Sequence, residues 1–338
     1  MATPTYTAWT VPATATKLSD LTMQVKDIPT PGPKQVLFKM TAASLNYRDV
    51  LISTRSLQYP GNHKSDLVPG SDGAGIIYST GADSTWKDKN GLPVIFNQNG
   101  WLHGDFRNLD FNTILGGTGQ DGTFQEYLVL PDEWFVEQPP SLSAVEAACL
   151  TTAGSTAWWA IRGGLDGRLD GSVGDWQRSW MDRRLEGKWV LTLGTGGDSC
   201  FAIQERRLVH SEGRYIDTLQ IASALGATVI ATSSSDSKLE IAKSLGATHL
   251  INYVKTPDWD EEVSRITGGK GVDHVIETGG AGTLMKSINS TRVGGLVSMP
   301  GVLTPNAPID ASFIPSILFR AKTGKLSFPF RRTLTCVY

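Results

Sequence analysis

The feature that most constrains this chain is an apolar run that ends in closely spaced glycines. The run covers residues 188–193 and leads directly into the sequence Gly-Thr-Gly-Gly. A buried strand that opens a helix through such a turn lets a pyrophosphate approach bare backbone N–H groups at the positive end of the helix. The segment Gly194–Gly197 could also be only a tight turn. The turn predicts a dinucleotide site built on Gly194, Thr195, Gly196 and Gly197.

The residues after this turn alternate between strand and helix patterns. Residues 237–245 carry apolar side chains at helical spacing, and the sequence Leu-Gly-Ala-Thr occurs at 225–228 and again at 245–248. Each of these glycines is placed to close a helix just before a strand. The alternation predicts a doubly wound parallel sheet of the Rossmann type. Its later strands are expected at 228–232, 248–252, 272–277 and 296–299.

The first half of the chain has a different pattern, with short β-rich runs cut by proline and glycine. It predicts a small irregular β-barrel. The runs lie at 35–43, 73–80, 93–96 and 124–130.

Composition fits a soluble enzyme with a small-molecule substrate. With 338 residues the chain can form two domains, and a net charge of −2 gives no basic field for nucleic acid or an anionic membrane. No run reaches transmembrane length, and residues 1–20 lack the pattern of a signal peptide. The three cysteines are too few for a disulfide framework. We therefore expect a cytoplasmic protein.

Four motifs in order resemble the medium-chain dehydrogenase/reductase superfamily, most closely its zinc-independent quinone-oxidoreductase-like branch. The resemblance spans about residues 10–320 and implies a GroES-like domain at 1–155, a Rossmann domain at 156–320, and NADP(H) held between them. The motifs are Ala43–Asp49, Pro69–Gly75, Gly122–Tyr127 and Gly194–Gly197.

The ligands of a catalytic zinc are missing from these motifs. Zinc-dependent relatives place a His-Glu pair where this chain has Ser71-Asp72, and a cysteine in the segment that here reads 46–49. Because a catalytic zinc needs three ligands drawn from Cys, His and carboxylate, Asp72 alone is insufficient. We expect no metal.

Asn46 and Tyr47 are the predicted catalytic residues. The resemblance puts them beside the nicotinamide, where a phenol or an amide can hydrogen-bond a carbonyl as hydride arrives. Tyr47 could instead pack on the nicotinamide ring or fill the barrel wall next to Leu45. Arg48 and Asp49 are expected to hold the loop by an ion pair or turn hydrogen bonds. The resemblance also puts Thr152 near the nicotinamide amide.

The end of the second Rossmann strand favours NADP(H) over NAD(H). NAD enzymes usually place a carboxylate there for the ribose 2′-OH, whereas a 2′-phosphate needs hydroxyls and a cation. This chain offers Ser233, Ser234 and Lys238.

The same serines have a structural explanation. Ser237 and Glu240 have the spacing of a capping box, which could coexist with phosphate binding by Ser233 and Lys238. Asp236 weakens the NADP(H) prediction because it adds a negative charge nearby.

Two segments depart from the superfamily pattern. Residues 205–220 form a charged insertion of 16 residues inside the cofactor helix, expected as a loop outside the core; a retained in-frame intron would also produce it. Residues 321–338 resemble a truncated, unrelated tail, in which Pro329 and the pair Arg331-Arg332 disfavour an edge strand. The tail makes the family homodimer doubtful.

The predicted function is NADP(H)-dependent, zinc-independent hydride transfer to a quinone, an enone or another conjugated carbonyl. The alternative is a catalytically impaired member of the superfamily, because of the insertion and the tail.

Overall fold

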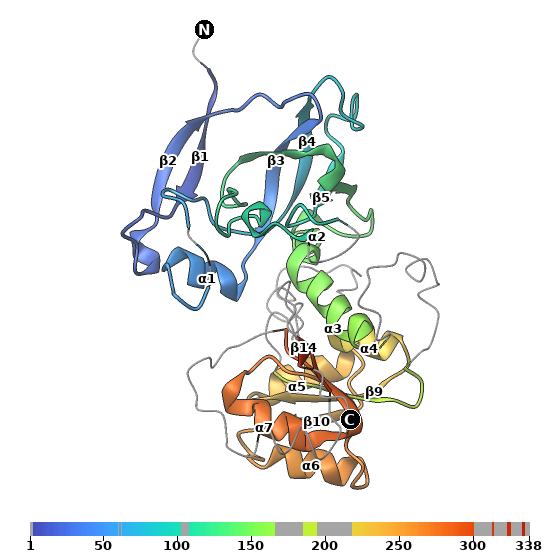
Figure 1. Cartoon of the computed structure of the whole chain (residues 1–338). Coiled ribbons are helices and arrows are strands. Elements are labelled where there is room, and N and C mark those ends of the chain that lie inside the picture. The colour runs from blue at the N-terminus through green and yellow to red at the C-terminus, as the bar shows by residue number, and fades with distance from the viewer. Residues whose placement is uncertain are drawn as a thin grey trace. The chain divides into compact units, whose positions relative to one another are not determined.

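The chain forms two compact units, one up to Thr152 and one from Ala153 onward (Figure 1). The computed structural model describes residues 3–59, 61, 63–102, 108–165, 185–194, 218–300, 313, 323–325 and 333–334. Within these ranges no helix has the length and apolar character needed to cross a membrane.

The first unit is built on an antiparallel sheet of five strands in the order β6-β3-β4-β5-β7, together with an antiparallel pair β1-β2. Phe38, Phe96 and Phe135 pack edge-on or tilted against one another in its core. The β-rich runs of the sequence are confirmed as strands. The elements are β1 (Thr5–Thr10), β2 (Thr22–Asp27), β3 (Gln35–Ser44), α1 (Tyr47–Ser53), β4 (Asp72–Thr80), β5 (Pro93–Phe96), β6 (Tyr127–Pro131), β7 (Phe135–Glu137) and α2 (Ala144–Ala147).

The second unit is the predicted Rossmann sheet. Its strand order is β10-β9-β8-β11-β12-β13-β14, and all neighbours are parallel except β13 and β14. The first six strands therefore have the doubly wound order, which reverses between β8 and β11. The elements are α3 (Ser155–Leu165), β8 (Trp189–Thr192), α4 (Thr218–Ala224), β9 (Thr228–Ser233), α5 (Asp236–Ser244), β10 (His249–Asn252), α6 (Trp259–Ile266), β11 (Val272–Ile276), α7 (Ala281–Ser290), β12 (Thr291–Ser298), β13 (Thr323–Lys325) and β14 (Thr333–Leu334).

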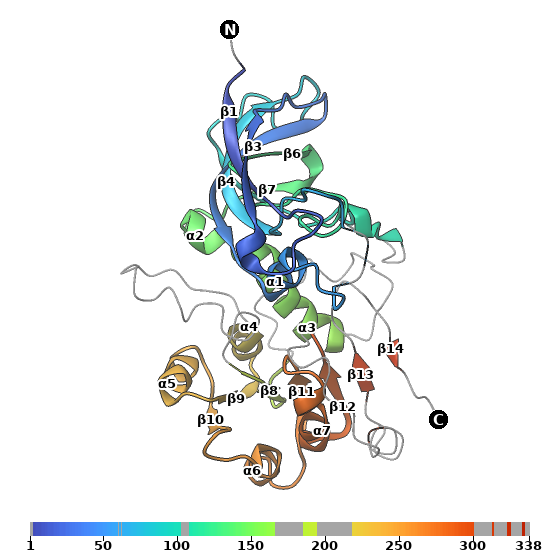
Figure 2. The same cartoon turned by 90° about the vertical axis from the view of Figure 1, so that its left-hand side faces the viewer.

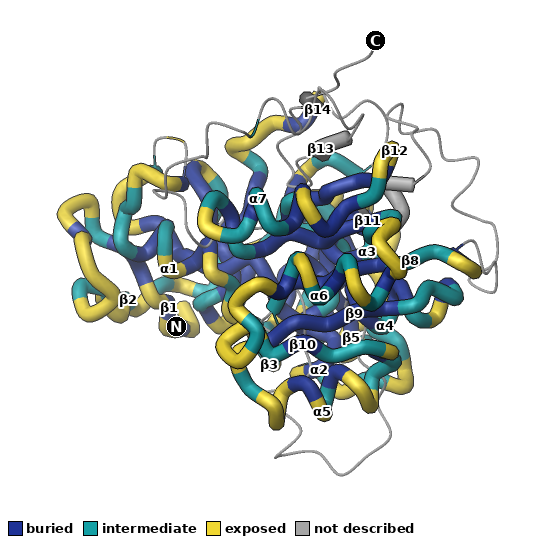
Figure 3. Tube along the Cα trace, turned by 90° about the horizontal axis from the view of Figure 1, so that it is seen from below, coloured by how far each residue is buried: buried dark blue, intermediate teal, exposed yellow. Residues whose placement is uncertain are grey.

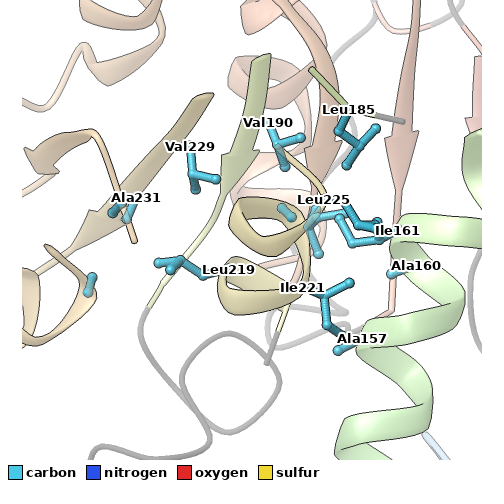
Figure 4. Close-up of a cluster of buried hydrophobic side chains, with 14 residues drawn as sticks. Ala157, Ala160, Ile161, Leu185, Val190, Leu219, Ile221, Leu225, Val229 and Ala231 are labelled. Carbon is cyan, nitrogen blue, oxygen red and sulfur yellow. The ribbon is translucent and has the colours of Figure 1, made fainter. Parts of the chain in front are cut away.

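Helices cover both faces of this sheet (Figure 2). Val190 of β8 packs with α3 and α4, as the side chains in Figure 4 show, whereas the next residue, Leu191, packs with α6 and α7. Successive strand residues point to opposite faces, so strands buried on both sides read as continuous apolar runs. The central strands accordingly form the most deeply buried part of this unit (Figure 3).

The expectation that all of residues 205–220 form a loop outside the core is wrong at its end. Thr218 begins α4, and Leu219 is fully buried in the cluster that covers one face of the sheet (Figure 4). The chain has an apolar residue followed by glutamine both at Ile203-Gln204 and at Leu219-Gln220. Leu219-Gln220 directly precedes Ile221 and belongs to α4. Residues 205–217 lie outside the described residues.

The expectation that Pro329 and the pair Arg331-Arg332 disfavour an edge strand in the tail is wrong for Thr333–Leu334, which form strand β14. Strand β13 pairs in parallel with β12, and β14 pairs antiparallel with β13. Residues 326–332 lie outside the described residues.

Candidate active site

Helix α1 begins at the Asn-Tyr segment that the sequence singled out. Asn46 is its N-cap residue, and the Asn46 backbone N–H donates to Oδ2 of Asp49 at 2.8 Å. A carboxylate three residues into a helix commonly satisfies this donor. The expected turn hydrogen bond at Asp49 is confirmed, and it fixes how the chain turns from β3 into α1.

The Asn46 side chain belongs to a buried polar network. Its amide Nδ2 donates to Oδ2 of Asp72 and, at 3.4 Å, to Oγ of Ser71. The other Asp72 oxygen, Oδ1, accepts the Thr152 backbone N–H at 2.7 Å. The Thr152 hydroxyl lies 3.1 Å from Ser71 Oγ and 3.0 Å from Gln98 Oε1. The network thus joins four segments that are distant in sequence.

Strand register brings these segments together. Asp72 is paired with Ser44, the last residue of β3, and Asn46 follows Ser44 by two residues along the chain. Gly70, just before, has a φ of 93°, and a Cβ there would lie 2.4 Å from Thr123 Oγ1. Glycine is therefore required at this turn.

Burial sets the charge behaviour of the two carboxyl groups. Asp72 is fully buried, and burial raises its pKa from 3.8 to about 7, against the hydrogen bonds from Asn46 and Thr152 and with the help of the nearby Asp49 charge. Burial also raises the pKa of Asp49, which the Arg48 charge and the Asn46 N–H partly offset. Asp72 is therefore poised to change protonation near neutral pH.

Tyr47 is on the accessible side of this network. Its side chain is 48% exposed, and that of Leu45 is 76% exposed, so neither fills the wall of the sheet. The wall-filling alternative for Tyr47 is excluded. Arg48 turns the other way and donates to Tyr59 Oη at 3.1 Å and to the Leu115 carbonyl at 3.0 Å.

The glycine turn that the sequence predicts to bind the cofactor starts at the carboxyl end of β8. Gly194 has a φ of 76°, and its N–H donates to Thr232 Oγ1 at 3.1 Å. The Leu193 carbonyl accepts from Thr278 Oγ1 at 2.9 Å. These bonds tie the turn to β9 and to the end of β11, on either side of the point where strand order reverses. Thr195, Gly196 and Gly197 lie outside the described residues.

The three residues predicted for a 2′-phosphate lie where β9 meets α5. Ser233 is buried at the end of β9, whereas Ser234 and Lys238 are exposed. Within the described ranges Lys238 forms no ion pair. The capping box of Ser237 and Glu240 is wrong, because the N-cap residue is Ser235 and Ser237 lies inside α5.

Asp236 does not present a free charge to this site. Its carboxylate accepts from Lys255 Nζ and, at 2.7 Å, from Asn252 Nδ2, and these bonds lower its pKa. Tyr253, 40% exposed, is held beside Ser233 by a 3.0 Å backbone hydrogen bond. Lys255 and Tyr253 were not anticipated, because only the β9–β10 pairing brings them to α5.

Sequence reasoning also missed the central role of Asp72 and of Gln98. The sequence analysis treated Asp72 only as a single, insufficient metal ligand. A carboxylate at the start of the apolar strand β4 nevertheless indicates that a polar group is buried there and needs a hydrogen-bond partner. Gln98 carries no such signal. The described residues contain no group of three or more His, Cys, Asp or Glu side chains able to hold a metal ion.

The fold and the two sites define an oxidoreductase with a GroES-like unit and a Rossmann unit. Residues 32–140 match the alcohol dehydrogenase GroES-like domain, and residues 218–331 match the zinc-binding dehydrogenase domain. The second match extends past Thr323, near which the resemblance was expected to fade. The chain belongs to the zinc-type alcohol dehydrogenase-like family of the medium-chain dehydrogenase/reductase superfamily, whose members use a nicotinamide cofactor.

Individual relatives agree with this assignment. A zinc-type alcohol dehydrogenase-like protein of Schizosaccharomyces pombe is 43% identical over 317 residues, covering 90% of this chain and 81% of that protein. The structure of an NAD-dependent alcohol dehydrogenase superposes with a TM-score of 0.73 at 27% identity, covering 94% of this chain and 83% of the other. A quinone oxidoreductase of Pseudomonas syringae superposes with a TM-score of 0.65 at 25% identity, covering 92% and 78%.

The buried Asp72 carboxyl should make the protein less stable as the pH rises. The pKa of Asp72 is about 7 in the folded state and 3.8 in the unfolded chain, so the folded protein binds this proton more tightly. The stabilisation from proton binding is complete below pH 4 and is lost as the pH rises to about 7. A shift of this size corresponds to about 4 kcal/mol. Urea unfolding should show that Asp72→Asn lacks this part of the decline. Equal pH slopes for the variant and the wild type would contradict the assignment.

Proposed function

We propose that this chain is an NADP(H)-dependent, zinc-independent reductase that delivers hydride to a quinone, an enone or another conjugated carbonyl. The observation that carries the proposal is the state of Asp72, both of whose oxygens accept N–H hydrogen bonds. A cation bound there would have to displace these donors. The site therefore favours activation of the substrate by hydrogen bonding over activation by a metal.

The second unit has the features needed to bind NADP(H). At the left-handed Gly194 a Cβ would meet Thr278 Oγ1 at 3.9 Å, and no closer atom of the described residues obstructs the approach of a pyrophosphate. Ser233, Ser234 and Lys238 would bind the 2′-phosphate, while Lys255 neutralises Asp236 beside them. The bound nicotinamide supplies the hydride.

The first unit supplies the acid. When hydride reaches a conjugated carbonyl compound, negative charge develops on its oxygen, and a hydroxyl donor there stabilises the charge and can deliver the proton. The half-exposed Tyr47 hydroxyl is suited to this role. Thr152 and Asn46 hold their positions through Asp72. The quinone oxidoreductase among the structural relatives supports this substrate class.

The direct test is NADPH oxidation by a quinone or an enone, using protein dialysed against a chelator and analysed for metals. We expect turnover to continue with zinc below one tenth of the protein concentration. Loss of turnover on chelation, restored by zinc, would overturn zinc independence. Absence of turnover with every conjugated carbonyl, while a simple alcohol is oxidised, would overturn the substrate class.

Lys238→Ala should selectively weaken NADPH binding. Loss of a charge-assisted hydrogen bond to the 2′-phosphate costs about 1–3 kcal/mol, so the dissociation constant for NADPH should rise roughly 5- to 150-fold while that for NADH stays nearly constant. Lys243→Ala is the matched control, since Lys243 is exposed in the last turn of the same helix. Fluorescence titration measures both constants. Equal losses for NADPH and NADH would refute the role of Lys238.

Tyr47→Phe should lower kcat by roughly a hundredfold or more, because the variant keeps the ring but lacks the donor. Steady-state kinetics with a saturating quinone or enone measures the change. Tyr78→Phe is the control, since Tyr78 is also about half exposed but lies on β4. A change below about threefold for Tyr47→Phe would favour ring packing over proton donation.

A further inference from the structure

The hydrogen bonds around Asn46 have definite directions. The Thr152 hydroxyl donates to Gln98 Oε1, a carbonyl oxygen that can only accept, at 3.0 Å. Since a hydroxyl has one proton, the 3.1 Å contact between Ser71 and Thr152 requires Ser71 to donate. Ser71 Oγ is then an acceptor toward Asn46 Nδ2 at 3.4 Å. The chain of donors runs from Asn46 to Gln98.

The second N–H of the Asn46 amide is also used within the protein. It donates to Oδ2 of Asp72, which as a carboxylate can only accept. Both amide protons of Asn46 are therefore bound to buried groups, because Ser71 and Asp72 are each fully buried. The oxygen of this amide, Oδ1, accepts in the capping box from the Asp49 backbone N–H and has a second lone pair that can meet the donor of a ligand.

We propose that Asp72 is a positioning residue that fixes Asn46 as a hydrogen-bond acceptor, so that Asn46 binds an N–H or O–H donor of the ligand and, of the pair Asn46-Tyr47, Tyr47 is the residue that polarises the substrate carbonyl. This inference rests on the proposed function and revises one part of the sequence-based expectation, in which the amide itself was a possible donor to the carbonyl. The ligand's donor is either the amide of the cofactor or a hydroxyl of the substrate.

Protonation of Asp72 reverses this arrangement. Burial raises its pKa to about 7, so the acid form is populated just below neutral pH. Oδ1 of Asp72 faces the Thr152 N–H, so a proton on the carboxyl group sits on Oδ2 and points at Asn46. Asn46 can accept that proton only by rotating its amide, which turns its oxygen inward and away from the Asp49 backbone N–H of the capping box. Below the pKa the site then presents an amide N–H.

We call the rotation of the Asn46 amide with the protonation of Asp72 the switch. Its charged neighbour is Asp49 on α1, whose negative charge raises the pKa of Asp72. The positive charge of Arg48 in turn lowers the pKa of Asp49. The partners from the other segments, Ser71, Gln98 and Thr152, are neutral. Removing the Asp49 charge should therefore move the switch to lower pH without abolishing it. Removing the Asp72 carboxyl should abolish it.

The first measurement follows the side-chain amide of Asn46 by NMR, with its ¹⁵N–¹H signals assigned by their loss in Asn46→Ala. In the wild type we expect both signals to titrate with a midpoint near pH 7. In Asp49→Asn the midpoint should move to lower pH, and in Asp72→Asn the titration should vanish. Signals that stay constant from about pH 5.5 to 8.5 in the wild type would overturn the proposal even if the Asp72 variant fails to fold.

The second measurement is the pH profile of kcat and KM. The wild type should lose activity on the acid side of this midpoint, and Asp72→Asn should be slower by about tenfold or more with no acid limb. Asp72→Glu should restore part of kcat, since it restores the acceptor. An unchanged acid limb in Asp72→Asn would overturn the proposal.

The Asn46→Ala variant shows whether the donor bound by Asn46 belongs to the cofactor or to the substrate, and this result is independent of whether the proposed function holds. If Asn46→Ala raises the dissociation constant of NADPH, the donor belongs to the cofactor, whereas a higher KM for the enone alone assigns it to the substrate. An unchanged value for both would overturn the acceptor role. If Asn46 titrates with Asp72 but no conjugated carbonyl is reduced, the proposed function fails and the positioning role stands.

Discussion

Among the described residues no cationic side chain is bonded to the buried Asp72, so its carboxylate must be satisfied by hydrogen-bond donors, and these donors organise the first unit. One donor is a side chain at the N-cap of α1, and the other is the backbone N–H of Thr152. The strand that carries Asp72, the helix that carries Tyr47 and the segment that leads out of the unit are thereby held together. The candidate site depends on this one group.

The second unit depends on a different constraint, the burial of a parallel sheet on both faces. Because helices cover both sides, the strands can be apolar throughout, and polar groups gather at their carboxyl ends. Thr232 and Thr278 show the consequence, since their hydroxyls hold the backbone of the glycine turn from the two neighbouring strands. Glu277, buried at the end of β11, likewise accepts from Gly279 and Gly280 and caps the start of α7.

Asp72 and Asp236 show how burial and bonding partners set the pKa of a carboxyl group in opposite directions. Asp72 is buried without a cation, and its pKa is raised to about 7. Asp236 is exposed and bound to Lys255, and its pKa is lowered. Both appear in the sequence as unexplained carboxylates in a site region. Their opposite behaviour follows from burial and from residues that arrive by strand pairing.

The sequence by itself determined the two-part α/β architecture, the position of most strands, the glycine turn at Gly194 and the importance of the segment that begins at Asn46. These features are local, since they depend on the period of apolar residues and on turn chemistry. Only the tertiary structure decided that the helix before β9 begins at Thr218, inside the segment expected as a loop, because the burial of Leu219 depends on strands and a helix that are distant in sequence. It also decided that the Asn46 amide points inward and that Tyr47 points outward. The Asp72 carboxylate that fixes the Asn46 amide comes from β4 and is itself held by Thr152, and no local pattern in the sequence records which distant segments will meet.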